Sequence, residues 1–257
     1  MTVPQAELLD VAHEAAGAAA AELLARFGHD QRGIRAKSGP TDLVSEADVA
    51  AETAIRRVLE ERRPEDAVLG EEGGATGNGD LRWVIDPLDG TINFLFGIPQ
   101  FAVSVACEDR DGAIVGVVLD PVRQEMFAAT RSGEATLNGA VIAASVQDDL
   151  GTSLVATGFA YDAAVRARQA VVMGRLLPRV RDIRRAGAAA LDLAWCACSR
   201  YDAYYERGVQ PWDVAAGGLI AERAGLTRRG LEAGDGMPAG VAVAPWALLD
   251  DLLGLIT

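Results

Sequence analysis

The stretch WVIDPLDGTINF, residues 83–94, places two aspartates three positions apart directly after an apolar run. A turn at this point can bring the carboxylates of Asp86 and Asp89 close together, with the backbone carbonyl of Leu88 exposed between them. Oxygen ligands of this kind suit hard divalent cations, above all Mg²⁺. The alternative is a plain Asx turn that caps a short helix, and the stretch alone does not decide between the two.

The next two residues, Gly90 and Thr91, open what is predicted to be a short helix. Free backbone N–H groups at a helix start attract anions, and the helix dipole adds to that attraction. A pair of cations beside such amides is an arrangement suited to a phosphate.

Two further acidic places favour the metal interpretation. Glu71 lies in a Gly-Glu-Glu-Gly sequence at a predicted strand end, where the alternative is a solvated acidic loop. Asp213 follows Pro211 and Trp212 at a predicted helix start, where an acid is also favourable on dipole grounds alone. A tryptophan is a costly anchor for an ordinary surface helix, so we expect it to fix the direction of Asp213. Together the acidic places predict one metal site.

Composition limits the possible partners. The chain has 257 residues, with 24 Lys and Arg against 37 Asp and Glu, a formal net charge of −13. We therefore expect no nucleic-acid partner, because phosphate backbones need clustered cations. No apolar run approaches the ~18 residues of a spanning helix. The N-terminal sequence has acids where a signal peptide has a basic region, so we expect no membrane or targeting segment.

Cysteine and histidine are scarce. Cys107, Cys196 and Cys198 are an odd set, typical of reduced thiols in a cytoplasm. The two histidines, His13 and His29, lie far from them in sequence, which argues against a zinc site. The same scarcity argues against catalysis by a histidine base.

Strand-rich and helix-rich segments alternate, which predicts a layered α/β or α+β enzyme fold. We expect an N-terminal half over 1–147 and a C-terminal half over 148–257, with a seam near 145–152. The predicted helices are 5–27, 45–61, 162–177, 189–198, 211–225 and a short final one. The predicted strands are 68–70, 83–85, 101–107, 113–119, 125–130, a hairpin at Asn138-Gly139, 153–157, one around 181–185, 202–206 and 241–244. Ser45 followed by Asp48 is close to a capping box.

With these blocks in place, the chain resembles the inositol monophosphatase family of Mg²⁺-dependent, lithium-sensitive sugar-phosphate phosphatases. The matching blocks, in the family's order, are DLVSEAD (42–48), GEE (70–72), WVIDPLDGTINF (83–94), RRAGAAALDL (184–193) and DAYYERGVQPWDVAAGGLIAERAG (202–225). The resemblance implies a layered α-β-α-β-α sandwich, a homodimer and hydrolysis of a phosphate monoester.

The resemblance also implies roles for individual residues. Glu71, Asp86 and the Leu88 carbonyl would hold a first metal ion, and Asp86, Asp89 and Asp213 a second. A third, weaker ion would depend on Glu71, which is therefore counted among the catalytic residues.

The family pattern assigns the remaining site residues to water and substrate. Thr91, paired with Asp48, would orient and deprotonate the attacking water. The amides of Gly90 and Thr91 would receive the phosphate, beside Asp89 and Asp213. The residues expected to face the alcohol portion of the substrate are Gly187, Ala188, Ala189 and Glu206.

Two departures from the family pattern bear on the substrate. Phe96 stands where the family often has a polar or aromatic-polar residue, and the loop over 73–82 is short. We expect inositol phosphate or a similar small polyol phosphate as substrate. Histidinol phosphate, fructose 1,6-bisphosphate and 3′-phosphoadenosine nucleotides remain alternatives within the fold. A non-catalytic relative that binds the transcription machinery is the alternative from another class.

Overall fold

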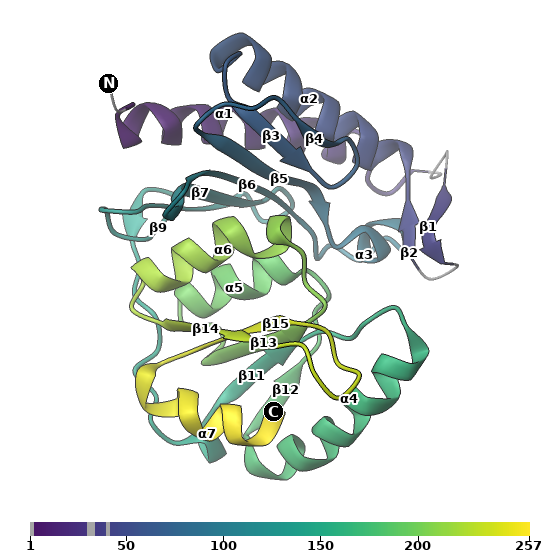
Figure 1. The fold of residues 1–257 in the computed structure, drawn as a ribbon, viewed down its shortest axis with the longest axis vertical. Helices are drawn as coiled ribbons and strands as arrows, with labels where there is room; N and C mark the ends of the chain where they lie inside the picture. The colour runs from purple at the N-terminus through teal and green to yellow at the C-terminus, as the bar shows by residue number, and fades with distance from the viewer. Residues whose placement is uncertain (1–2, 30–33, 40–41) are drawn as a thin grey trace.

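Helices and sheets stack in five layers in the computed structural model, which describes residues 3–29, 34–39 and 42–257 (Figure 1). The order from top to bottom is helix pair, sheet, helix pair, sheet, helix pair, so the predicted α-β-α-β-α sandwich is confirmed. The helices are α1 Gln5–Leu24, α2 Glu46–Arg62, α3 Thr91–Leu95, α4 Ala163–Leu176, α5 Ala189–Ala197, α6 Pro211–Arg223 and α7 Trp246–Ile256.

The first sheet joins eight strands in the order β10-β9-β8-β7-β6-β5-β3-β4. Its pairs are antiparallel except β3 with β5, which run parallel. The strands are β3 Ala67–Gly70, β4 Gly74–Thr76, β5 Arg82–Asp89, β6 Ala102–Asp109, β7 Gly112–Asp120, β8 Glu125–Thr130, β9 Thr136–Leu137 and β10 Ala140–Val141.

The second sheet has five strands in the order β12-β11-β13-β15-β14, and β11 pairs in parallel with both of its neighbours. The predicted seam at 145–152 falls between β10 and β11. The helices α5 and α6 between the two sheets both come from the C-terminal half, and they pack against the first sheet, which comes from the N-terminal half. The strands are β11 Leu154–Thr157, β12 Asp182–Arg184, β13 Ala203–Arg207, β14 Thr227–Leu231 and β15 Gly240–Ala244.

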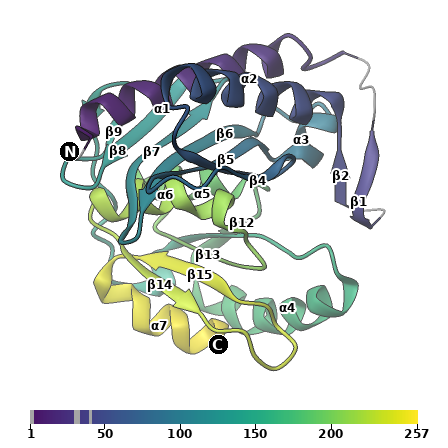
Figure 2. The ribbon, with the colours of Figure 1, turned by 45° about the horizontal axis from the view of Figure 1, so that its top comes forward.

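The apolar stripe of α1 explains the outer layer above the first sheet. Apolar residues recur three and four positions apart, the spacing that puts them on one helix face. The buried set is Leu8, Val11, Ala12, Ala15, Ala16, Ala19, Ala20 and Leu23. Helix α2 packs beside α1, and together they cover the sheet (Figure 2).

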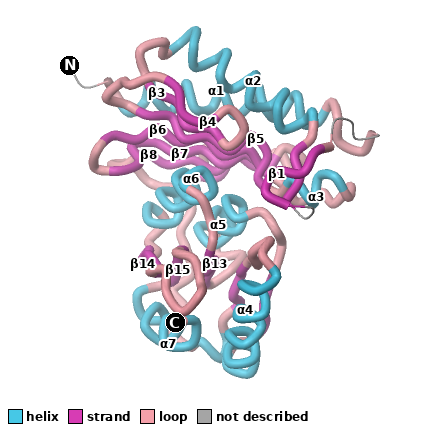
Figure 3. The backbone as a smooth tube through the Cα atoms, turned by 45° about the vertical axis from the view of Figure 1, so that its right-hand side comes forward, coloured by secondary structure: helices cyan, strands magenta, loops and turns pink. Residues whose placement is uncertain are grey.

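The sequence predicts a loop over 36–42 between the first two helices, and this prediction is wrong in part. Strand β1, Arg35–Gly39, pairs antiparallel with β2, Asp42–Val44, and positions 40 and 41 lie outside the described residues. The hairpin stands beside α3, at one end of the first sheet (Figure 3). A polar sequence without alternating apolar residues carries no strand signal, which is why pattern reasoning missed it.

The middle layer approaches the first sheet very closely at Gly116 of β7. A Cβ there would lie 2.8 Å from the Cα and 2.9 Å from the carbonyl oxygen of Ala216 in α6. Both atoms belong to the backbone, so no side-chain rotation relieves the overlap. The absence of a side chain at this position therefore sets the distance between sheet and helix.

We expect Gly116→Ala to destabilise the chain by about 1–3 kcal/mol, the usual range for overpacking a core. The measurement is the urea midpoint of unfolding. Gly174→Ala is the matched control, because Gly174 lies within α4 and a methyl group added to it would have no neighbour within 4 Å. That change should be neutral or stabilising, since alanine is the better helix former. Equal midpoints for the two variants would contradict the close approach.

Candidate active site

A bulge in β5 carries the first two acids. The strand was predicted to end at Asp86, but it continues to Asp89, with a register shift against β6 between those two residues. In a regular strand, residues three apart point to opposite faces. The extra residue of the bulge changes that alternation, and Pro87 is tolerated there because a bulge leaves its residue unpaired. The Leu88 N–H donates to Asp86 Oδ1 at 3.0 Å.

Asp89 joins the first sheet to the middle layer. Its carboxylate accepts hydrogen bonds from the N–H groups of Ala189 (2.9 Å), Ala190 (2.8 Å) and Leu191 (3.4 Å) at the start of α5. These are amides that a helix leaves without intrahelical partners, and an anion is favoured there. Gly90, with φ +97°, allows the close contact, because a Cβ would lie 3.3 Å from that of Ala188.

Asp213 occupies the start of α6, as predicted. Its Oδ2 accepts a 2.6 Å hydrogen bond from the Gln210 N–H, as part of a capping box. Ser104 of β6 donates to the Trp212 carbonyl at 3.0 Å, so the helix start is fastened to the strand that pairs with Asp86. The carboxyls of Asp86 and Asp213 lie close enough to influence each other's pKa. The first sheet and α6 therefore meet at these two acids.

Glu71 follows β3 on a loop that a buried acid holds in place. Glu52 of α2 is 3% exposed and accepts hydrogen bonds from the N–H groups of Glu72 and Gly73, both at 2.8 Å. Its partner Arg56 donates to it at 2.7 Å and to the Gly74 carbonyl at 2.8 Å. Sequence reasoning missed this positioning role, although an acid on the buried face of α2 was the available signal.

The short segment 73–82 is not all loop. It contains β4, which pairs antiparallel with β3 and so shapes the turn after Glu71. Phe96 lies just beyond α3 and is 75% exposed.

Thr91 and Asp48 meet as the family pattern implied. The Thr91 hydroxyl lies 3.0 Å from Asp48 Oδ1 and 3.1 Å from the Leu88 carbonyl oxygen. Asp48 is fully buried, and its other oxygen accepts from the N–H (2.8 Å) and hydroxyl (2.7 Å) of Ser45. The predicted capping box at the start of α2 is confirmed, and it holds Asp48 in the direction of Thr91.

Glu206 extends from β13 beside the end of β11. The Tyr204 hydroxyl donates to its Oε2 at 3.0 Å. A Cβ on Gly158 would collide with the Glu206 carboxylate, so any other residue at this position would have to displace that carboxylate. Burial, together with the charge of Asp213, raises the pKa of Glu206 to about 7, while the Tyr204 hydrogen bond and the charge of Arg185 lower it. The contacts of Gly158 and Tyr204 with Glu206 were not predicted.

The electrostatics fit a divalent cation. Burial raises the pKa of Asp86 well above its ordinary value, and the charges of Glu71, Asp89 and Asp213 raise it further. Within the described part of the chain, the aspartates of this group form no ion pair; they are Asp86, Asp89 and Asp213. Mutually repelling carboxylates without a basic partner are the donor set that Mg²⁺ prefers.

The same acids already accept hydrogen bonds from the protein backbone. Among the described residues, no three acidic, histidine or cysteine side chains are gathered closely enough to form a ready-made metal site. Each of Asp86, Asp89 and Asp213 accepts from a backbone N–H, which engages one oxygen in Asp86 and Asp213 and both oxygens in Asp89.

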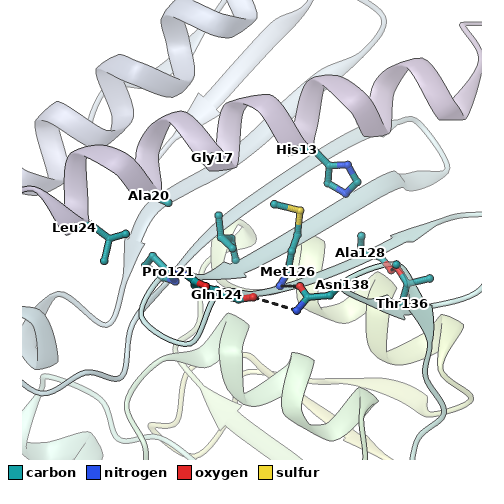
Figure 4. A pocket seen from close by; sticks show the side chains of 12 residues that line it. His13, Gly17, Ala20, Leu24, Pro121, Gln124, Met126, Ala128, Thr136 and Asn138 are labelled. Atoms are coloured by element: carbon teal, nitrogen blue, oxygen red, sulfur yellow. Dashed lines mark hydrogen bonds between the residues drawn. The ribbon is translucent and has the colours of Figure 1, made fainter.

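A separate cavity of about 470 Å³ lies between α1 and the β8–β9 region (Figure 4). Its lining is mostly apolar, and His13 points into it from α1. None of the predicted site residues lines this cavity. The cavity is therefore separate from the acids around β5. No helix in the described ranges is long and apolar enough to cross a membrane.

The fold and the site define a layered α/β protein in which buried acids meet at the starts of several helices. The sequence model of the inositol monophosphatase family matches residues 4–256. The chain belongs to that family.

Curated relatives carry two kinds of name. Inositol-1-monophosphatase SuhB of Mycobacterium tuberculosis is 40% identical over 246 residues, covering 91% of this chain and 84% of that protein. Inositol-1-monophosphatase of Synechocystis is 43% identical over 220 residues, covering 84% and 76%. Nus factor SuhB of Pseudomonas aeruginosa is 46% identical over 195 residues, covering 72% and 70%.

Solved structures share the fold over nearly the whole chain. The extragenic suppressor protein suhB of Bartonella henselae has a TM-score of 0.89 at 32% identity, covering 97% of this chain and 98% of that one. Inositol monophosphatase of Anabaena has a TM-score of 0.83 at 33% identity, covering 97% and 94%.

In a chelating buffer we expect thermal stability to fall between about pH 5 and 8. Burial raises the pKa of Asp89 to about 7 and of Asp213 to about 8, so the folded chain holds protons that the unfolded chain loses. This stabilisation is complete below the unfolded pKa of about 4 and is lost as the pH rises through the folded values. The measurement is Tm at half-unit pH steps.

Asp86→Asn should flatten this pH dependence, because it removes a carboxyl whose own pKa is raised well above its ordinary value in the folded chain. Asp80→Asn is the control, since the Asp80 side chain is 98% exposed, and it should follow the wild-type curve. Added Mg²⁺ should raise Tm more at pH 8 than at pH 5, because only ionised carboxylates bind it. Parallel curves for all three proteins would refute the coupling of these acids.

Proposed function

We propose that this chain is a phosphatase that hydrolyses phosphate monoesters of inositol or a similar small polyol or sugar, with Mg²⁺ as cofactor. The observation that carries the proposal is the Thr91 hydroxyl, bonded to the buried Asp48 and placed beside the Leu88 carbonyl. This pair lies at the end of the bulge that carries Asp86 and Asp89. A hydroxyl next to a fixed carboxylate, beside oxygen ligands, supports activation of water.

Glu71, Asp86, Asp89, Asp213 and the Leu88 carbonyl would hold the metal ions. Mg²⁺ bound there supplies charge neutralisation for the phosphate and a lowered pKa for a coordinated water. The family assigns Asp86 to two ions. Its burial at 2% exposed and its contact with Asp213 support that assignment.

The residues of the chain would orient and deprotonate the nucleophile. The Thr91 hydroxyl donates a hydrogen bond to Asp48. The lone pairs of the Thr91 oxygen would then accept a hydrogen bond from an attacking water. Ser45 keeps Asp48 from turning away. The amides of Gly90 and Thr91, at the start of α3, would receive the phosphate oxygens. No histidine or cysteine nucleophile is required.

The alcohol portion of the substrate would lie between the turn before α5 and β13. Gly187, Ala188 and Ala189 form that turn, with Gly187 at φ +88°. The Glu206 carboxylate, held by Tyr204, would accept hydrogen bonds from hydroxyl groups. The relatives named inositol-1-monophosphatase support a polyol as substrate. Histidinol phosphate, sugar bisphosphates and adenosine phosphates are the competitors that a substrate screen separates.

The homodimer and the cytoplasmic location also belong to the proposal. Phe96 and Ile98 are 75% and 48% exposed. These two apolar side chains in the turn after α3 support a dimer interface there. The free thiols of Cys107, Cys196 and Cys198 support a reducing compartment.

Relatives named Nus factor SuhB favour a second candidate function, a non-catalytic role in the transcription machinery. The presence of Thr91, Asp48 and all four metal-site acids in this chain favours the enzyme over a purely structural protein. Both roles fit one chain if the partner surface lies away from the acids.

Phosphate release should depend on Mg²⁺ across a panel of inositol, sugar, histidinol and nucleotide phosphates. We expect activity with Mg²⁺, loss on exhaustive chelation, and inhibition by Ca²⁺, which favours longer bonds and looser coordination. Asp86→Asn should raise the Mg²⁺ concentration for half-maximal activity more than Asp89→Asn does, because Asp86 would serve two ions. Asp80→Asn is the exposed control. Full activity after chelation would disprove the cofactor assignment.

Thr91→Ala should lower kcat by about 10²–10⁴-fold, the usual value of positioned acid–base help. KM and the Mg²⁺ requirement should stay close to wild type, because losing a contact made in the transition state acts on turnover. Thr91→Ser is the matched control, since it keeps the hydroxyl that bonds to Asp48. Normal turnover in Thr91→Ala would mean that Thr91 and Asp48 have no part in activating water.

A further inference from the structure

Two neighbouring arginines at the end of β12 differ in what they contact. The Arg184 guanidinium pairs with Asp182 at 2.6 Å and also donates to the Ile183 carbonyl. Arg185 makes no hydrogen bond or ion pair with another residue in the part of the chain that the structure describes. Its side chain is exposed, so its five donors are available to a ligand.

The Arg185 side chain covers the turn that leads into α5. A Cβ on Gly187 would collide with Arg185 Nη1 and would lie 3.2 Å from Asn93 Nδ2. Asn93 fixes this turn by donating to the carbonyls of Gln100 (2.7 Å) and Ala186 (2.9 Å). The guanidinium therefore lies on the surface where the alcohol portion of the substrate is proposed to bind.

The charge of Arg185 acts on two buried acids, Glu206 and Asp192. It lowers the pKa of Glu206 and of Asp192, opposing the burial that raises both. Asp192 is 1% exposed, and neither of its carboxyl oxygens has a hydrogen-bond partner among the described residues. Arg185 is thus an exposed cation that acts by its charge on two buried acids, Glu206 and Asp192, without a hydrogen bond or ion pair to either.

We propose that Arg185 is a specificity-determining residue that binds a second acidic group, a phosphate or a carboxylate, on the alcohol portion of the substrate. This inference rests on the proposed phosphatase function and names its substrate class more closely. Glu206 suits a hydroxyl and repels an anion, whereas the planar fork of an arginine matches phosphate and carboxylate with two parallel hydrogen bonds. A substrate with both groups uses both side chains.

The exposure of Arg185 decides what the contact does. The contact lies away from the scissile bond, so it contributes equally to ground-state and transition-state binding and acts mainly on KM. Because it is exposed, salt should weaken the contact.

The test compares three substrates that are all phosphate monoesters. They are a polyol monophosphate with an uncharged alcohol portion, a sugar bisphosphate, and a phosphorylated sugar acid. The wild type should favour at least one of the two substrates with a second acidic group. The sugar bisphosphate and the sugar acid separate a phosphate from a carboxylate as the group that is bound.

Arg185→Gln should raise KM for the preferred acidic substrate about 10- to 100-fold more than for the uncharged one, the usual value of hydrogen bonds to charged groups. Arg185→Lys should recover part of the preference, because a point charge replaces the fork. Arg184→Gln, the adjacent control, should keep the wild-type preference, since Arg184 is engaged by Asp182.

Equal changes of KM on all three substrates in Arg185→Gln would overturn the assignment, and so would the same loss of preference in Arg184→Gln. No phosphate release from any substrate by the wild type with Mg²⁺ would instead overturn the proposed function, and this inference with it. A preference that is lost only in Arg185→Gln and that weakens with added salt would establish the residue's role.

Discussion

The hydrogen bonds between Asp89 and the first amides of α5 fix how the first sheet meets the middle layer. Three buried N–H groups of the helix have this one carboxylate as their acceptor. Leaving such donors without a partner costs about 1–3 kcal/mol each. Gly90 lets β5 approach Ala188 closely enough for the bonds to form. The proposed metal ligands on β5 and the proposed alcohol pocket before α5 are therefore parts of one rigid junction.

Three acids of the site share a second property, because each is fixed at the start of a helix. Asp48 closes the capping box of α2, Asp213 does so for α6, and Asp89 serves α5 from outside. The helix dipoles favour the ionised form at these places, while burial and mutual repulsion oppose it. Each of these three carboxylates accepts a hydrogen bond from a backbone amide, which fixes its direction. Such preorganised groups need little rearrangement when a charged ligand arrives.

Local chemistry made much of this predictable, and long-range contacts account for the rest. Turn residues, apolar spacing and the Ser45–Asp48 capping box indicated most helices and strands, and the resemblance to the inositol monophosphatase family implied the order of the layers. The polar strands β1, β4 and β14 lack an alternating apolar pattern and were missed. Pro87 suggested a strand end, because a bulge cannot be recognised without its partner strand. The acids of the site were predicted from their motifs. The roles of Glu52 and Gly158 were not predicted, because they depend on contacts with residues 20 and 48 positions away in the sequence.

Because of the contact between Gly158 and Glu206, the substitutions that are acceptable at one of these positions depend on the residue at the other. With the carboxylate in place, even one methyl group at Gly158 has no room. Once Glu206 is replaced by a small residue, that space opens and a larger side chain at position 158 becomes acceptable. The effects of changes at the two positions are therefore non-additive. A lineage that alters its substrate pocket through Glu206 gains a second variable position at once, whereas one that keeps Glu206 has none.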